Sequence, residues 1–285
     1  MRKNCLICLS KKLNKILNLG KHPYADTFIE KNKLNLKEPI IKLEVEICSK
    51  CGCVQTSHST NTYRRYNLHN YSYTSSNSNF SKNHWIKYAS QISKELKINK
   101  SSKLLEIGSN DGFLLKEFRK LNKCLVLGVD ASNFMTKISQ KNNIKTYSMI
   151  FNSKSSVKIL NDYGKFDLII ANNVFNHSDN PLDFIKAVEK LLNNKGSFVF
   201  ELPYWLDTVK SKKFDQIYHE HVTYFNFRMI KQMLLKTKFK FYKAEKVNYH
   251  GGSIRVYLKK SAKNYNEKLI KKFILQEKSE KIYDL

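Results

Sequence analysis

The chain of 285 residues is long enough for one large α/β domain with a small appended module, and no stretch approaches the roughly 20 apolar residues of a membrane-spanning helix. Residues 1–12 are basic but lack the apolar core of a signal peptide, so we expect a cytoplasmic protein that has no membrane partner. The formal net charge of +27 suits anionic partners, but the lysines are spread along the whole chain without a basic stripe, so we do not expect it to bind nucleic acid. We also expect a monomer.

Two CxxC pairs lie in residues 1–62, which we interpret as a zinc-binding module. Metal ligation explains these cysteines better than disulfides because the cytoplasm keeps thiols reduced, and paired thiolates suit a tetrahedral Zn²⁺. Cys53 competes for the fourth position, but the pair spacing favours Cys51. Four thiolates leave no open coordination position, so we expect a structural metal that stabilises a segment with little hydrophobic periodicity. The predicted ligands are Cys5, Cys8, Cys48 and Cys51.

A connecting segment follows at residues 63–100. Its first part, residues 63–81, is polar and rich in tyrosine, which predicts a loop or lid. A helix is expected after it, at about residues 84–96. The segment would thus join the zinc-binding module to the domain that follows.

Residues 101–260 alternate short apolar runs with amphipathic segments, which is the pattern of a parallel sheet with crossover helices. We expect strands at residues 103–107, 125–129, 144–148, 166–171 and 197–202. Helices are expected between them, for example at 112–121 and 181–192, followed by a helix at 227–236 and by strands at 239–247 and 253–260 that are joined through a turn at 250–252. Residues 261–285 predict a charged amphipathic helix over 262–282. The expected fold is α/β, with a Rossmann-like domain after the zinc-binding module.

A cofactor site is expected where the first of these strands ends, in residues 104–112. Gly108 lets a ligand approach the backbone, and Asp130 ends the next strand about 20 residues later, where it can accept hydrogen bonds from ribose hydroxyls. A dinucleotide site would need three glycines, but residues 108–113 offer two. S-adenosylmethionine carries an amino group and a sulfonium instead of phosphates, and acidic and amide side chains suit it better. The candidates are Glu106, Gly108, Asn110, Asp111, Asp130, Asn172 and Asn173, the last two directly after the fourth strand.

Four ordered motifs, EIGSNDG (106–112), ANNVFNH (171–177), IYHEHVTYF (217–225) and HGGSIRVY (250–257), resemble the sugar C-methyltransferases that act on nucleotide-linked keto-deoxysugars. The resemblance implies a Rossmann-like class I methyltransferase domain over residues 101–260 that binds S-adenosylmethionine. It also implies a catalytic Tyr-x-Glu-His segment, here Tyr218, Glu220 and His221, and a substrate-positioning tyrosine at Tyr71 or Tyr73. Members of that family usually continue into a further C-terminal α/β domain, of which residues 261–285 would be the start.

The expected reaction is C-methylation of a nucleotide-linked keto-deoxysugar, which requires removal of a proton next to the ketone. Histidine is a suitable base because its unperturbed pKa is about 6.5, and we assign this role to His221, with Glu220 or Tyr218 orienting it or binding the enolate oxygen. A hydrogen-bonded polar cluster, or a metal pair formed by His219 and His221, remains an alternative. The turn at His250 and the nearby Arg255 are candidates for binding the diphosphate, although a plain hairpin turn would leave the same pattern.

Two other functions remain open. The zinc-binding module and the positive charge would also suit a methyltransferase that acts on RNA or another macromolecule, although no Asn-Pro-Pro-Tyr motif or Pro-Cys nucleophile occurs. The short C-terminal part would also suit a non-catalytic relative.

Overall fold

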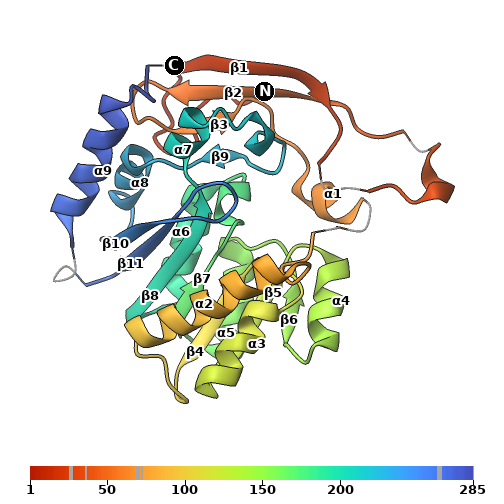
Figure 1. Cartoon of the computed structure of the whole chain (residues 1–285), viewed down its shortest axis with the longest axis vertical. Coiled ribbons are helices and arrows are strands. Elements are labelled where there is room, and N and C mark those ends of the chain that lie inside the picture. The colour runs from red at the N-terminus through yellow and green to blue at the C-terminus, as the bar shows by residue number, and fades with distance from the viewer. Residues whose placement is uncertain (26–27, 36, 69–70, 72, 262–264, 285) are drawn as a thin grey trace.

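The computed structural model describes residues 1–25, 28–35, 37–68, 71, 73–261 and 265–284, and these fold around two β-sheets (Figure 1). The larger sheet has seven strands in the order β10-β11-β8-β7-β4-β5-β6, and the smaller has four strands in the order β1-β2-β3-β9. The smaller sheet lies above the larger one in the view of Figure 1, with α1 between them at one side. Among the described helices, none has both the length and the apolar composition that crossing a membrane requires.

The seven-stranded sheet confirms the α/β prediction. Its parallel part consists of β4 (Lys103–Ile107), β5 (Leu125–Asp130), β6 (Thr146–Ser148), β7 (Phe166–Ile170) and β8 (Leu192–Pro203). The hairpin β10 (Lys240–Val247) and β11 (Ser253–Lys259) adds two antiparallel strands beside β8. Because β4 lies between β5 and β7, the chain reverses its direction of travel across the sheet there, and the carboxyl ends of these three strands meet at one edge.

Helices cover both faces of this sheet. On one face, α2 (Asn79–Glu95) and α3 (Phe113–Asn122) bury Tyr88 and Phe118 against strands β4, β7 and β8. On the other face, α5 (Ser153–Tyr163), α6 (Pro181–Leu191) and α8 (Phe227–Leu234) contribute to a core that continues into the smaller sheet. The remaining helices are α1 (Thr62–Asn67), α4 (Asn133–Lys141), α7 (Trp205–Lys210) and α9 (Glu267–Ser279).

The N-terminal segment forms a sheet with a hydrophobic core, which we did not expect. The segment supplies strands β1 (Leu13–His22), β2 (Ile41–Cys48) and β3 (Val54–Thr56). The fourth strand of this sheet, β9 (Thr223–Tyr224), comes from a distant part of the chain. The apolar residues of β2 alternate with Lys42, Glu44 and Glu46, which is the period of a strand, and the two carboxylates are themselves buried. Lys15 offsets the burial of Glu44 because its ammonium lies 2.9 Å from the Glu44 carboxylate.

Residues 63–81 also contain more regular structure than predicted. Helix α1 begins there because the Asn61 side chain accepts a hydrogen bond from the Arg64 amide, and α2 begins at Asn79, five residues before the expected start, because Ser78 caps it. Helix α9 lies against α8, with the rings of Phe227 and Phe273 stacked 4.0 Å apart. The start of the predicted C-terminal helix at residues 262–264 lies outside the described residues.

Candidate functional site

The four predicted zinc ligands converge at one point of the smaller sheet. Their sulfur atoms lie within 4.8 Å of one another, with 3.4 Å between Cys5 and Cys51 and 3.5 Å between Cys8 and Cys48. The amides of Ile7 and Cys8 also point at the Cys5 sulfur, which suits a thiolate ligand. A set of four converging thiolates fits a structural Zn²⁺. Cys53 is not part of this set, because its thiol hydrogen-bonds to the side chain of Gln55.

The loop after β4 forms the base of the cofactor region. Gly108 has a φ of +74°, and a Cβ atom placed there would lie 2.8 Å from the side chain of Val174, so only glycine fits without displacing a neighbour. The next residues turn sharply, with Asn110 at a φ of +50°. Asn110 fixes this turn to the connecting segment, because its side chain accepts a hydrogen bond from the Ser75 amide and donates one to the Tyr73 carbonyl.

Asp130 stands at the carboxyl end of β5, as predicted for a ribose-binding residue. Its two carboxylate oxygens accept hydrogen bonds from the amides of Asn110 and Ser132, each at 2.8 Å, which fixes the orientation of the carboxylate. Burial raises the pKa of Asp130 to about 6. The side chain still borders a cavity, and each oxygen retains a lone pair with which it can accept a further hydrogen bond.

Asn172 and Asn173 follow β7, the strand that neighbours β4 on the side opposite β5. The Asn172 carbonyl oxygen accepts hydrogen bonds from the Tyr88 hydroxyl and the Glu201 amide, which directs the Asn172 amide nitrogen away from them. That nitrogen and the side-chain oxygen of Asn173 are both buried and have no hydrogen-bond partner among the residues that the structure describes. Both residues line the cavity, and a buried donor and a buried acceptor left without partners there suit a ligand-binding site.

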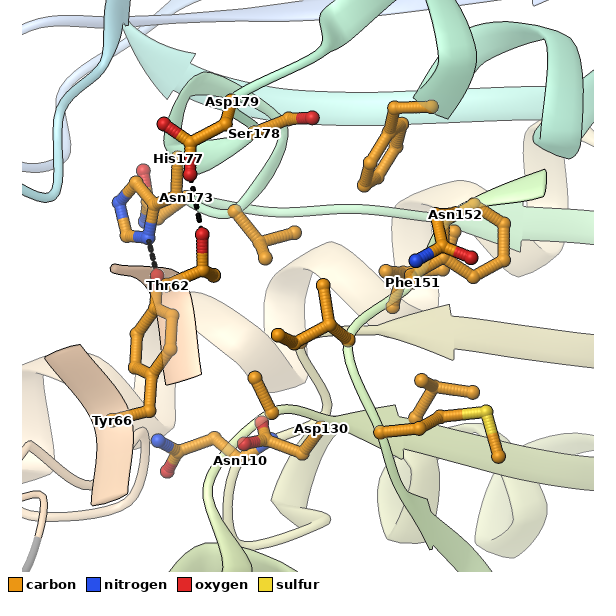
Figure 2. A pocket seen from close by; sticks show the side chains of 18 of the residues that line it. Thr62, Tyr66, Asn110, Asp130, Phe151, Asn152, Asn173, His177, Ser178 and Asp179 are labelled. Carbon is orange, nitrogen blue, oxygen red and sulfur yellow. Dashed lines mark hydrogen bonds between the residues drawn. The ribbon is translucent and has the colours of Figure 1, made fainter. Parts of the chain in front are cut away.

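A cavity of about 470 Å³ lies where these strand ends meet the connecting segment (Figure 2). It falls within the size range of about 300–1,000 Å³ that is usual for sites that bind small molecules. Of the predicted cofactor and substrate residues, eight line it: Gly108, Asn110, Asp130, Asn172, Asn173, Tyr71, Tyr73 and His250. Its wall also includes residues that the sequence analysis did not assign: Thr62, Tyr66, Phe151, Asn152, His177 and Asp179.

Tyr218 and His221 form a hydrogen-bonded pair at this cavity. The His221 Nδ1 atom lies 2.7 Å from the Gln216 carbonyl oxygen, which can only accept, so Nδ1 carries the proton. In the neutral ring, Nε2 then accepts a hydrogen bond from the Tyr218 hydroxyl, also at 2.7 Å. Burial lowers the pKa of His221 to about 4, so the ring is neutral at physiological pH. Tyr218 lines the cavity, whereas His221 is not among the lining residues and lies behind Tyr218. The sequence analysis expected His221 itself to contact the substrate.

A second histidine borders the cavity. The His177 Nδ1 atom lies 3.0 Å from the hydroxyl of Tyr66 (Figure 2), and its buried Nε2 has no hydrogen-bond partner within the described part of the chain. Burial and the neighbouring His221 and Arg65 hold the pKa of His177 well below its usual value. The ANNVFNH motif contained this histidine, but its sequence position alone did not separate a site residue from a capping or core residue.

Glu220 lies within the protein and does not line the cavity. Its carboxylate accepts a hydrogen bond of 3.2 Å from the Tyr71 hydroxyl, and 1% of the residue is exposed. Tyr71 itself borders the cavity, so this contact links the Tyr-x-Glu-His segment to the connecting segment.

Comparisons with known proteins agree with this architecture. Residues 82–244, more than half of the chain, match the family described as "Methyltransferase domain", and residues 5–66 match a zinc-binding domain family. The chain belongs to the methyltransferase-domain family. It binds S-adenosylmethionine as its cofactor and carries an N-terminal zinc-binding module with four cysteine ligands.

Two relatives illustrate how far the similarity extends. The C-methyltransferase NovU of Streptomyces niveus is 22% identical over 98% of this chain, which spans 66%, just under two thirds, of the length of that relative. The magnesium protoporphyrin IX methyltransferase of Synechocystis PCC 6803 was solved with bound S-adenosylhomocysteine. It superposes with a TM-score of 0.50 at 15% identity, over 63% of this chain and 83% of its own, which shows a shared fold.

Two of the predicted cofactor residues lie behind the cavity wall of this methyltransferase. Asp111 accepts hydrogen bonds from the side chains of Ser75 and Ser76, so it fixes the connecting segment to the turn after β4. Glu106 is 5% exposed, and burial together with Asp111 and Asp130 raises its pKa well above the usual value. The sequence placed both residues in the right motif but did not show which side chains face the ligand.

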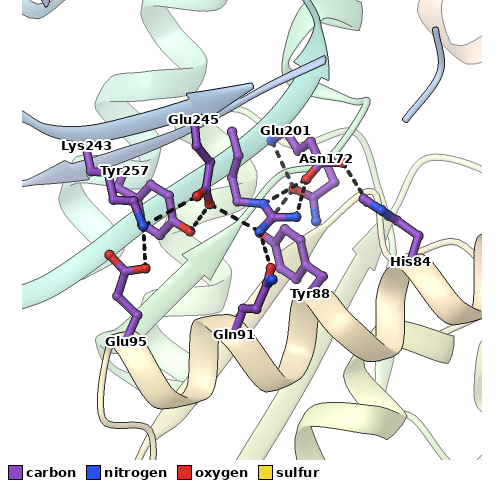
Figure 3. A network of polar contacts seen from close by, with 10 residues as sticks. His84, Tyr88, Gln91, Glu95, Asn172, Glu201, Lys243, Glu245 and Tyr257 are labelled. Carbon is purple, nitrogen blue, oxygen red and sulfur yellow. Dashed lines mark hydrogen bonds and ion pairs between the residues drawn. The ribbon is translucent and has the colours of Figure 1, made fainter. Parts of the chain in front are cut away.

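Arg255 also lies elsewhere than the sequence suggested. Its guanidinium is 2.8 Å from the Glu201 carboxylate and 3.3 Å from that of Glu245, over the ring of Tyr88. Figure 3 shows Glu201, Glu245 and Tyr88 within one network of polar contacts. Arg255 is opposite Glu201 in the pairing of β11 with β8, and both are buried. His84 holds the other oxygen of Glu201 at 2.7 Å. Arg255 therefore ties α2 to the sheet and is not among the residues that line the cavity.

Proposed function

We propose that this methyltransferase transfers a methyl group to a carbon atom next to the ketone of a nucleotide-linked keto-deoxysugar. The observation that carries the proposal is the Tyr218–His221 pair, in which a neutral imidazole holds the hydroxyl of a tyrosine that borders the cavity. The similarity to a C-methyltransferase over 98% of the chain supports the same reaction class.

The pair acts as a base in two linked steps. The Tyr218 oxygen takes the proton from the substrate carbon as the Tyr218 hydroxyl proton passes to Nε2 of His221. The electron pair of the broken C–H bond becomes an enolate, whose carbon is the nucleophile for methyl transfer. The Gln216 carbonyl keeps Nδ1 protonated, so Nε2 remains the acceptor throughout.

In this proposal, His177 would bind the enolate oxygen. When the Tyr66 hydroxyl donates to Nδ1, the proton of the neutral ring is on Nε2, which is buried and has no hydrogen-bond partner among the described residues, while His177 itself lines the cavity. A hydrogen bond from this N–H would stabilise negative charge as it develops on the substrate oxygen.

S-adenosylmethionine supplies the electrophilic methyl group when it is bound. Asp130 would accept hydrogen bonds from the ribose hydroxyls, and the apolar side chains of Ile150 and Phe151 would contact the adenine. The unpaired donor of Asn172 and acceptor of Asn173 match the carboxylate and ammonium groups of the amino-acid part. Tyr71, Tyr73 and His250 line the remaining wall, where the sugar would lie.

Turnover of a TDP-linked 4-keto-deoxysugar tests this proposal. Purified protein with S-adenosylmethionine is expected to give a product 14 Da heavier, whose new methyl group is bonded to carbon in the NMR spectrum. The His221→Ala variant should lose about 100-fold or more of kcat, the usual contribution of a general base. Tyr63→Phe, which alters an exposed tyrosine outside the cavity, is the control and should retain activity. Methylation on oxygen, or equal rates for His221→Ala and wild type, would contradict the proposal.

A further inference from the structure

A second concave surface lies away from the cofactor cavity and has a strongly positive lining. This open hollow has a volume of about 820 Å³. It is formed by the loop before β7, the second half of α6, the segment after α8 and the end of β11. We call it the lysine groove, after its six lysines: Lys165, Lys186, Lys190, Lys236, Lys238 and Lys260.

The positive charge of the lysine groove is not neutralised by the protein. Glu189 is the single carboxylate in its lining, and that carboxylate accepts a hydrogen bond from the backbone amide of Lys238. Within the part of the chain that the structure describes, no carboxylate forms a salt bridge with any of the six lysines. The groove therefore holds six ammonium groups against one carboxylate.

Lys260 is the anchored member of this cluster. It is only partly exposed, and its ammonium donates a hydrogen bond of 2.5 Å to the carbonyl oxygen of Leu192. Burial and the charges of Lys165 and Lys238 lower the pKa of Lys260. The neighbouring ammonium groups thus repel one another across the groove, and a bound anion would relieve this repulsion.

The lysine groove is separate from the proposed catalytic site. Lys165 immediately precedes β7, whereas Asn172 and Asn173 follow its other end. The two hollows therefore lie at opposite ends of the same strand. A ligand in the lysine groove would not contact the cofactor.

The lining favours a compact anion over a nucleic acid. The lysines converge on one hollow from four segments, whereas a nucleic-acid backbone needs an extended basic track. No aromatic side chain is among the residues that line the groove, so it offers no platform on which a base can stack. Lysine ammonium groups bind phosphate as point charges and need no planar partner.

From these observations we propose that the lysine groove binds a small anion that carries two or more phosphate groups. The charge of such an anion matches several converging lysines, and the volume of the groove is of the size usual for small-molecule sites. This site is additional to the methyl-transfer site and does not depend on the sugar substrate.

Isothermal titration calorimetry with inorganic tripolyphosphate tests the proposal. The titration is done in 0.15 M salt, where the Debye length of about 8 Å screens general attraction to a positive protein. The wild type is expected to bind one equivalent. The double variant Lys165→Gln/Lys238→Gln removes two exposed ammonium groups beside Lys260 and should bind at least 10-fold more weakly, whereas Lys165→Arg/Lys238→Arg should retain binding.

A matched control separates the groove from the overall charge. Lys87→Gln/Lys116→Gln removes the same charge from exposed positions on α2 and α3, and its affinity should stay within two-fold of wild type. Equal weakening in both glutamine pairs would overturn the proposal, as would the absence of binding to wild type. Tighter binding of a single-stranded RNA than of tripolyphosphate, with the same sensitivity to Lys165→Gln/Lys238→Gln, would also overturn it in favour of a nucleic-acid surface.

Discussion

His221 shows how one backbone contact can set the chemistry of a side chain. The Gln216 carbonyl fixes the tautomer, and the fixed tautomer makes Nε2 the acceptor for the Tyr218 hydroxyl. The sequence predicted a histidine base from the Tyr-x-Glu-His motif. It did not predict that the tyrosine would lie between the histidine and the cavity, because both contacts depend on how residues 214–221 turn.

The lowered pKa of His221 predicts the acid limb of the pH profile. Because the pKa is about 4, the ring is neutral and can accept a proton at all higher pH values, and it loses this ability only as the pH falls through about 4. We expect kcat, measured with both substrates saturating, to stay level from pH 8 down to about pH 5. An ordinary histidine would instead halve kcat near pH 6.5. A half-maximal kcat at that pH would contradict the role given to the buried ring.

Other single residues mark the limit of prediction from sequence. Asp130, Asn172 and Asn173 were predicted because they follow strands, and parallel strands present their carboxyl ends at one edge. Arg255 was misplaced because its neighbour depends on strand register, which sets it opposite Glu201 in β8. The sequence contains no local signal for that pairing, which joins residues more than 50 positions apart.

At the scale of elements, β9 connects the zinc-binding module to the catalytic segment. This strand consists of Thr223 and Tyr224 and begins two residues after His221, yet it pairs with β3 of the N-terminal sheet. The amide of Thr56 also donates a hydrogen bond of 2.9 Å to the carbonyl of Val222. Because β3 begins three residues after Cys51, the metal site and the Tyr218–His221 pair share one sheet.

Removal of zinc is therefore expected to impair catalysis more than cofactor binding. The Cys48→Ser variant, or treatment with a chelator, should loosen β3 and β9 and lower kcat at least 10-fold, because metal binding contributes to the folding of such modules. Affinity for S-adenosylhomocysteine, measured by calorimetry, should change less than three-fold, since Gly108 and Asp130 belong to the other sheet. The Cys124→Ser variant is the control, because this cysteine lies in the other sheet's core. An unchanged kcat in zinc-free protein would contradict the link through β9.

The elements themselves were predicted unevenly. Strands β4, β5, β7 and β8 emerged clearly because each contains a short apolar run that is buried between two layers of helices, whereas β6 is polar and only partly buried. Strand β9 could not be found from its own residues, since two residues carry no period and their pairing partner lies some 170 positions earlier. Strand β2 was not predicted although Glu44 and Glu46 alternate with apolar residues at the period of a strand; what the sequence did not show is that both carboxylates are buried.

At the scale of the whole molecule, the cavity lies where the strand ends of the larger sheet meet the segments that join it to the smaller sheet. The larger sheet contributes the strand ends with Gly108 and Asp130, and the segments between the sheets contribute Tyr66, Tyr71 and Tyr218. Figure 2 shows Tyr66 and Asp130 among the residues of the cavity wall. Buried Arg65 joins these parts: its guanidinium lies 2.9 Å from Asp179 and 3.2 Å from the carbonyl of His219. The larger sheet alone would therefore form an incomplete site.

Exchange of the substrate proton with solvent tests the central claim most directly. A TDP-linked 4-keto-deoxysugar is incubated in D2O with the protein and S-adenosylhomocysteine, so that deprotonation occurs without methyl transfer, and the signal of the proton next to the ketone is followed by NMR. The wild type should replace this proton with deuterium far faster than buffer does. Tyr218→Phe and His221→Asn should slow the exchange about 100-fold, and Tyr63→Phe should not. Exchange at the rate of buffer with wild type, or at the wild-type rate with Tyr218→Phe, would contradict the account.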